Sequence, residues 1–400
     1  MKNIPFSVPA VIALACTSAF IGACGGSDDG GVAPVVITVA GPNVVSQWDE
    51  IAATTINQPA AASGTPEEQR PTYATDLATV HLAMYDAVMA IVGTHKPYAY
   101  TPASLSADAS QEAAVATAAY RTLLGLFPAR GASYQSAYDT YLASLPAGAA
   151  KDQGVAIGTA AATAILALRA NDGRAVVLAP YVPGTEPGQF RGLNPINRYV
   201  PSIKPFAVDS NSQFRAPGPV ALTSATYAAD VNETMALGSA ASTTRTAAQT
   251  ETARFHTEPP PLFWSRNIRQ FAMTAGSIAE HARLMALLWV VQSDAINTCF
   301  ESKYFHQTWR PTSAIQLADT DGNAATTPDP TWAPVVPTPN HPEYPAAHAC
   351  NSASVAAALG GYYRTSRITF DFNSSVTSST HTYDSTQAFV DEIAVARIAG

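Results

Sequence analysis

Apolar residues recur along most of the chain at the spacing of helices. In 77-LATVHLAMYDAVMAI-91 they return every three or four residues, which is the spacing of one helical face. Residues 109–127 and 151–170 are rich in alanine, which has the highest helix propensity. The pattern resumes over 224–239 and 274–300, and the second of these is apolar on nearly all sides, which places it at the centre of a bundle. Little of the chain alternates with the period of a strand, so we predict an all-α fold.

Two segments interrupt this pattern. Between about residues 174 and 222 the chain is rich in Pro, Gly and Asn, which predicts a long loop that covers the bundle. The serine-rich stretch 373-NSSVTSSTHTYDST-386 is also interpreted as a loop. The predicted fold is therefore a helical bundle with long Pro/Gly-rich loops.

The first residues have the features of an export signal. Lys2, the apolar run 11-VIALACTSAFIGA-23 and small residues before Cys24 predict a signal peptide over residues 1–23. The stretch 21-IGAC-24 is similar to the lipobox of bacterial lipoproteins, in which the cysteine becomes the lipidated first residue. An ordinary signal peptide followed by a chance cysteine is the alternative.

The residues after Cys24 predict a tether. The stretch 25-GGSDDGG-31 gives slack to a lipid anchor, so we expect a flexible, lipid-anchored tether over 24–50 and a folded domain over 51–400. Gly25 after the cysteine is similar to the outer-membrane sorting signal of Gram-negative bacteria. We therefore expect an outer-membrane lipoprotein or a periplasmic protein, which meets the membrane only through its lipid.

Charge is scarce in this chain. The formal net charge is −8 and only 13% of residues are charged, which argues against nucleic acid as a partner and requires any cationic site to be local. Cys16 falls in the signal peptide and Cys24 is expected to carry lipid, so Cys299 and Cys350 remain for the folded part. An exported chain allows these two to pair. The oligomeric state stays open.

Two cations stand close together in 303-KYFHQTWRP-311. Lys303 and Arg310 are seven residues apart, almost two helical turns, so we expect both on one helical face, with Pro311 ending the segment. Two aligned cations in so uncharged a chain predict a binding site for an anion.

The second candidate stretch is 340-NHPEYPAAHACNSASVAAALGGYY-363. Prolines impose an extended approach, after which a helix of small residues begins near Pro345 or Ala346. The start of a helix offers free N–H groups to an anion. His348 lies in this first turn, where it could exchange a proton; a histidine with a purely structural role is the alternative.

Together these stretches resemble a known family. Lys-x6-Arg-Pro in 303-KYFHQTWRP-311, then 345-PAAH-348, then 396-ARIAG-400 are similar to the motifs that unite vanadium-dependent haloperoxidases with type 2 phosphatidic-acid phosphatases and bacterial acid phosphatases. The family's second motif is Pro-Ser-Gly-His, so Ala346 and Ala347 depart from it. The third, Ser-Arg-x3-Gly-x-His, only begins here, and its histidine is expected beyond residue 400.

The resemblance extends over roughly residues 70–400 and is closest to the bacterial chloroperoxidase branch, through 294-DAINTCFESK-303 and Trp309. It implies a vanadate cofactor, with phosphate as a competing anion. Cations would neutralise the equatorial oxygens, the Ala347 N–H would donate to one of them, and His348 would act as acid and base. The residues expected around the anion are Lys303, Arg310, Ala346, Ala347, His348 and Arg397.

The implied reaction is oxidation of halide to hypohalous acid by hydrogen peroxide, with a small organic molecule as a further substrate. Phe300 and His341 stand where the chloroperoxidase pattern has aromatic residues at the halide pocket. An imidazole at the second place favours bromide over chloride. In the family the last histidine is the axial vanadium ligand or the phosphorylated nucleophile, so we expect a C-terminally truncated chain of weak or no activity. The alternatives are a periplasmic acid phosphatase and a non-catalytic surface lipoprotein.

If Lys303 and His348 reach one oxyanion, two cysteines lie close together. Cys299 is one helical turn before Lys303, and Cys350 is two residues after His348. Their Cα atoms could then meet within the roughly 4.4–6.8 Å that a disulfide needs. Two separately buried thiols are the alternative.

Overall fold

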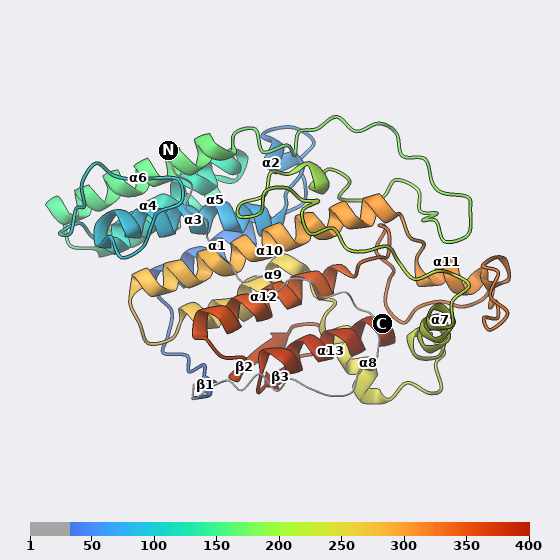
Figure 1. Ribbon diagram of the computed structural model, residues 1–400. Coiled ribbons are helices and arrows are strands. Elements are labelled where there is room, and N and C mark those ends of the chain that lie inside the picture. The colour runs from blue at the N-terminus through green and yellow to red at the C-terminus, as the bar shows by residue number, and fades with distance from the viewer. Residues whose placement is uncertain (1–32) are drawn as a thin grey trace.

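The structure is a computed structural model that describes residues 33–400, and these residues form a mostly helical body (Figure 1). The helices are α1 (Val44–Ile56), α2 (Pro66–Gln69), α3 (Tyr73–Val92), α4 (Gln111–Leu126), α5 (Ala132–Ser144), α6 (Ala149–Arg169), α7 (Ala225–Gly238), α8 (Ala247–Phe255), α9 (Pro260–Arg269), α10 (Ile278–His306), α11 (Pro311–Gln316), α12 (Ala347–Tyr363) and α13 (Thr386–Ala399). Short 3-10 turns are η1 (Pro128–Arg130), η2 (Val200–Ser202), η3 (Gln270–Ala272) and η4 (Ala318–Thr320). The predicted helical fold class is confirmed.

Helix α10 runs through the middle of the body, as its apolar character predicts. It begins with a capping box in which Ser277 and Glu280 satisfy each other's backbone N–H groups. One side of α10 packs against α3, with α4 and α6 beyond it, and the other side packs against α12, which in turn packs against α13 (Figure 1). Helix α3 is the one described helix long and apolar enough to cross a membrane, but most of it is buried in this core.

A buried carboxylate joins four of the helices. Asp49 in α1 accepts hydrogen bonds from His81 in α3, from Trp289 in α10 and from Ser265 in α9, at 2.9, 2.9 and 2.5 Å. All four residues are fully buried. Because a buried charge is costly without partners, this network fixes how the four helices meet.

The structure also contains a small sheet that the sequence analysis did not predict. Its strands are β1 (Val35–Val36), β2 (Ile368–Ser374) and β3 (Ser379–Tyr383), in the order β1-β2-β3. β1 is parallel to β2, and β2 is antiparallel to β3, with Phe370 opposite Tyr383. The interpretation of 373–386 as a loop is therefore wrong. Alternate residues of β2 are buried, but the polar residues between them masked this short pattern.

The N-terminal part of the described chain differs from the expected tether. Residues 35–36 pair with β2, and α1 begins at Val44 after an Asn43 N-cap. Val45 and Trp48 are buried in the core, at 0% and 1% exposure, so this segment is folded because it supplies apolar side chains to the bundle. The predicted signal peptide, Cys24 and the glycine-rich stretch lie outside the described residues.

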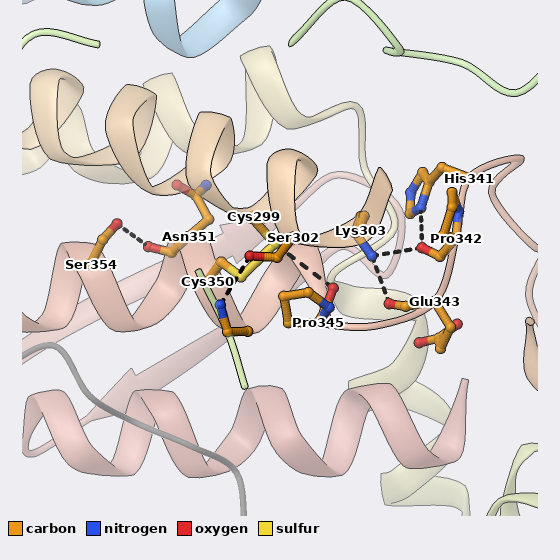
Figure 2. The surroundings of a disulfide bond; sticks show 11 residues. Cys299, Ser302, Lys303, His341, Pro342, Glu343, Pro345, Cys350, Asn351 and Ser354 are labelled. Atoms are coloured by element: carbon orange, nitrogen blue, oxygen red, sulfur yellow. Dashed lines mark hydrogen bonds between the residues drawn. A yellow bond between two sulfur atoms is a disulfide. The ribbon is translucent and has the colours of Figure 1, made fainter. Parts of the chain in front are cut away.

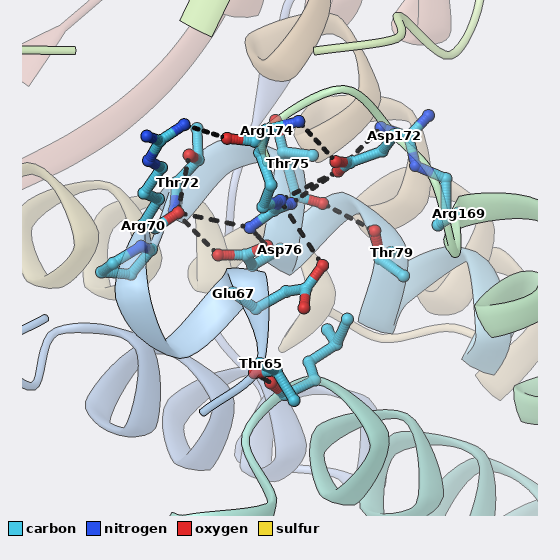
Figure 3. A network of polar contacts seen from close by, with 12 residues as sticks. Thr65, Glu67, Arg70, Thr72, Thr75, Asp76, Thr79, Arg169, Asp172 and Arg174 are labelled. Carbon is cyan, nitrogen blue, oxygen red and sulfur yellow. Dashed lines mark hydrogen bonds and ion pairs between the residues drawn. The ribbon is translucent and has the colours of Figure 1, made fainter. Parts of the chain in front are cut away.

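The long loop after α6 covers the C-terminal half of α10, as predicted. Arg174, at the start of this loop, forms ion pairs with Asp76 (2.7 Å), Asp172 (2.9 Å) and Glu67 (3.5 Å) (Figure 3). The side chains of all four residues are buried or nearly buried. Further along, the backbone N–H groups of residues 206–208 donate to Asp294 in α10. The loop is therefore held by buried carboxylates rather than by regular secondary structure.

Candidate oxyanion site

Lys303 lies in the last turn of α10 with its side chain fully buried. Its ammonium Nζ donates to the backbone oxygens of Pro342 and Glu343, at 2.9 and 2.6 Å (Figure 2). Burial lowers the pKa of Lys303 to about 7, although the Glu343 carboxylate opposes this shift; Arg310 adds to it. Two of the three ammonium hydrogens are used by the protein, and the third is left for another acceptor.

Arg310 reaches the same place by a different route from the one predicted. Gln307 has a left-handed conformation (φ 49°, ψ 43°) and ends α10, so Lys303 and Arg310 do not share one helical face. Pro311 does not end a segment but occupies the first position of α11, where a missing N–H costs nothing. The turn nevertheless brings Arg310 Nη1 to 2.6 Å from a carboxylate oxygen of Glu343.

Glu343 was missed by the sequence analysis, although it stands inside the quoted stretch between His341 and Pro345. Its side chain is 35% exposed, but the Oε2 atom next to Arg310 is buried and receives no well-aligned hydrogen bond. Its backbone is held at both ends, because its N–H donates to Thr308 and its C=O accepts from Lys303. In the sequence, Glu343 is marked only by its position between Pro342 and Pro345, which does not indicate a place among the cations.

Helix α12 begins where the sequence predicts, with Ala346 as N-cap and Ala347 as its first residue. Ala346 has no hydroxyl, and no side chain caps the helix. The free N–H groups of the first turn, including that of Ala347, therefore point out of the helix start as backbone donors.

His348 occupies the next position, with both ring nitrogens engaged. Nε2 lies 3.0 Å from the backbone oxygen of His256, which can only accept, so Nε2 carries the hydrogen. Nδ1 is then the accepting nitrogen, 3.3 Å from Arg397 Nη1. Burial, and secondly the charge of Arg397, lower the pKa of His348 to about 3, so its imidazole is neutral near pH 7.

Arg397 comes from the last turn of α13. Burial lowers its pKa, and the Glu343 carboxylate opposes this effect while Arg310 adds to it. The Nε atoms of both Arg397 and Arg310 are buried without a hydrogen-bond partner within residues 33–400. Such orphaned donors, beside the third hydrogen of Lys303, suit a tetrahedral oxyanion, so these residues fit a vanadate or phosphate.

The expected halide-pocket residues are also brought together. The rings of Phe300 and His341 meet edge to face, with centroids 5.2 Å apart. His341 Nδ1 donates to the Pro342 oxygen at 3.0 Å, and burial, followed by the charge of Lys303, lowers its pKa to about 4. Phe300 also packs with Ile203 and Ile296, so one wall of this region is apolar and the other is a neutral imidazole.

Cys299 and Cys350 form a disulfide in the structure, with Cα atoms 6.3 Å apart. The bond joins α10 to α12, one helical turn before Lys303 and two residues after His348 (Figure 2). It therefore holds the two helices that supply these site residues at a constant separation.

A second polar network, which the sequence did not reveal, holds His256, the residue whose backbone oxygen bonds to His348. Glu392 in α13 accepts from His256 (2.8 Å), from Tyr383 (2.7 Å) and from His381 (2.9 Å). His381, from β3, also bonds to Glu251 at 2.9 Å and takes no part in the oxyanion site. Because His256 is fixed by its ring, its backbone oxygen is positioned to orient His348.

Comparisons with known proteins find one family model and several solved structures. Residues 283–400 match a family model described as the VCPO second helical-bundle domain. This C-terminal part of the chain is therefore similar to a domain of that family. No curated protein matches it in sequence.

Three solved structures of vanadium haloperoxidases resemble the whole body. A bacterial vanadium-dependent iodoperoxidase matches with a TM-score of 0.66 and 19% identity, over 89% of each chain. The apo form of a bacterial vanadium-dependent chloroperoxidase matches with a TM-score of 0.62 and 15% identity, over 87% of this chain and 91% of that one. The holo form of such an enzyme gives 0.63 and 16%, over 91% and 93%. The resemblance to vanadium haloperoxidases predicted from the motifs is confirmed.

Proposed function

We propose that the protein is a vanadium-dependent haloperoxidase, which oxidises halide with hydrogen peroxide at a vanadate held at the start of α12. The main support is the convergence of Lys303, Arg310 and Arg397, which come from three separate elements in a chain with few charges. Orphaned, buried guanidinium donors at two of them would be costly without an anion to accept from them.

Each residue then has a defined part. The third hydrogen of Lys303, the Nε–H groups of Arg310 and Arg397, and the Ala347 N–H would hold the oxygens of the anion. When bound, vanadate supplies Lewis-acid activation of hydrogen peroxide. His348 takes or returns a proton at Nδ1, the nitrogen that faces Arg397. The neighbouring His256 carbonyl prevents ring rotation that would turn Nδ1 away.

The halide would lie beside Phe300 and His341. Because His341 is neutral near pH 7, it offers no cationic attraction, and its polar ring weakens the desolvation that chloride oxidation needs. We therefore propose that bromide is preferred over chloride, with a small organic molecule receiving the oxidised halogen.

The second candidate is a phosphomonoesterase that uses the same oxyanion site. Lys303, Arg310, Arg397 and the start of α12 would hold a phosphate ester as well as a vanadate, and Ala346 withholds the motif's hydroxyl donor from either anion. Hydrolysis of p-nitrophenyl phosphate without vanadate or peroxide distinguishes this activity from halide oxidation.

Orthovanadate titration followed by calorimetry, together with dye bromination, tests the proposal. We expect Lys303→Ala and Arg397→Ala to weaken vanadate binding at least tenfold, because each removes a charge-assisted donor. His348→Ala should lower bromination by roughly 10²–10⁴-fold and affect vanadate binding much less. Arg215→Ala is the matched control, since Arg215 pairs with Glu301 outside the site.

Equal vanadate binding by the wild type, Lys303→Ala and Arg397→Ala would contradict the assigned site. Chlorination at the same rate as bromination would contradict only the halide preference.

A further inference from the structure

A carboxylate stands among the three cations of the oxyanion site, and the proposed function leaves it without a role. Glu343 Oε2 is 2.6 Å from Arg310 Nη1, and the Glu343 charge also acts on Lys303 and Arg397. A carboxylate repels a bound anion, so its presence weakens binding unless the anion can give it a hydrogen.

Glu343 cannot leave this place by a movement of its backbone. Its N–H donates to the Thr308 oxygen at 3.0 Å and its C=O accepts from Lys303 at 2.6 Å, and three residues later the chain reaches Ala346, the N-cap of α12. Only the side chain is free to adjust. Its carboxylate therefore remains within reach of whatever binds between Arg310 and Lys303.

The buried Oε2 atom is also available as an acceptor. It is close to Arg310 but receives no aligned hydrogen bond from any group in residues 33–400. Buried polar atoms are normally hydrogen-bonded, so this oxygen, next to the Arg310 guanidinium, can still accept a hydrogen bond. An O–H on the bound anion would satisfy it with a short, charge-assisted hydrogen bond.

We propose that Glu343 makes the oxyanion site selective for tetrahedral oxyanions that carry a proton. Hydrogen vanadate and hydrogen phosphate donate an O–H to the carboxylate, whereas sulfate, which is fully deprotonated near pH 7, meets only its negative charge. This inference rests on the proposed assignment of Lys303, Arg310 and Arg397 to the anion. The cations provide the affinity, and Glu343 provides the discrimination between oxyanions of similar size.

The test compares phosphate and sulfate binding by calorimetry at pH 7, without vanadate, halide or peroxide. We expect the wild type to bind phosphate at least tenfold more tightly than sulfate. Glu343→Gln should lower this ratio at least fivefold, mainly by strengthening sulfate binding, because an amide can donate to sulfate and bears no charge. Glu343→Asp should keep a preference for phosphate, since it keeps the acceptor.

Glu301→Gln is the matched control, because it removes a carboxylate on α10 that pairs with Arg215 away from the site. Thermal unfolding of each variant checks that it is folded. Equal affinities of the wild type for the two anions, or an unchanged ratio in Glu343→Gln, would overturn the role of Glu343 alone. Failure of either anion to bind any folded variant would overturn the oxyanion site and, with it, the proposed function.

Discussion

Burial of Lys303 disfavours the positive charge that binding an anion would require. A fully buried ammonium is costly, and its pKa falls to about 7, compared with about 10.4 in an unfolded chain. Hydrogen bonds to the backbone oxygens of residues 342 and 343 offset part of this cost and orient Nζ at the anion site. A lysine tuned in this way loses its charge near neutral pH unless an anion holds the proton.

This shift predicts how stability depends on pH. Between about pH 7 and pH 10 the unfolded chain binds more protons at Lys303 than the folded chain does, so stability rises with pH over this range. Relative to Lys303→Met, the wild type should gain about 2 kcal/mol between pH 6.5 and pH 9. Urea unfolding in buffers free of phosphate and sulfate measures the difference. A difference that does not change with pH would show that Lys303 keeps an ordinary pKa.

At the scale of elements, the sequence predicted the long helices and the start of α12 because each carries a periodic pattern or a proline signal. It placed Lys303 and Arg310 wrongly on one helical face, because nothing in the local pattern marks Gln307 as the end of α10. Glu343 and the His256–Glu392 pair were missed for another reason. Their roles arise from contacts between segments distant in sequence, such as Glu392 with His256, which local periodicity does not record.

The attachment of the long loop depends on Arg174, which pairs with three carboxylates (Figure 3). Burial raises the pKa of one of them, Asp76, to about 6, and Arg174 opposes this shift. Arg174→Met should therefore cost about 3–5 kcal/mol, because it leaves buried carboxylates without a countercharge.

The same substitution at Arg215 should cost much less stability, because that pair is more exposed and is screened by solvent. Urea unfolding of both variants at pH 7.5 gives the comparison. Similar losses in the two variants would mean that the buried network contributes no more than a surface ion pair. In that case the hydrogen bonds to Asp294 and apolar packing would hold the long loop after α6 in place.

For the whole molecule, the site joins parts of the chain that are distant in sequence. The end of α10, the start of α12 and the end of α13 meet there, and the Cys299–Cys350 disulfide closes a loop across a sequence separation of 51. Such a loop stabilises by about 4 kcal/mol on the chain-entropy account. Disulfides persist mainly in oxidising compartments, so this bond and the predicted signal peptide point to the same place in the cell.

We therefore predict that export and disulfide formation go together. In a Gram-negative host, the full chain should fractionate with membranes and resist thiol alkylation after denaturation without reductant. Cys24→Ser should release the protein into the soluble periplasmic fraction while the disulfide still forms, because lipid attachment and thiol pairing use different cysteines. When residues 24–400 are made in the cytoplasm, Cys299 and Cys350 should react with the alkylating reagent, since cytoplasmic reducing systems keep thiols reduced. Membrane association that survives Cys24→Ser would exclude a lipid on this cysteine as the anchor.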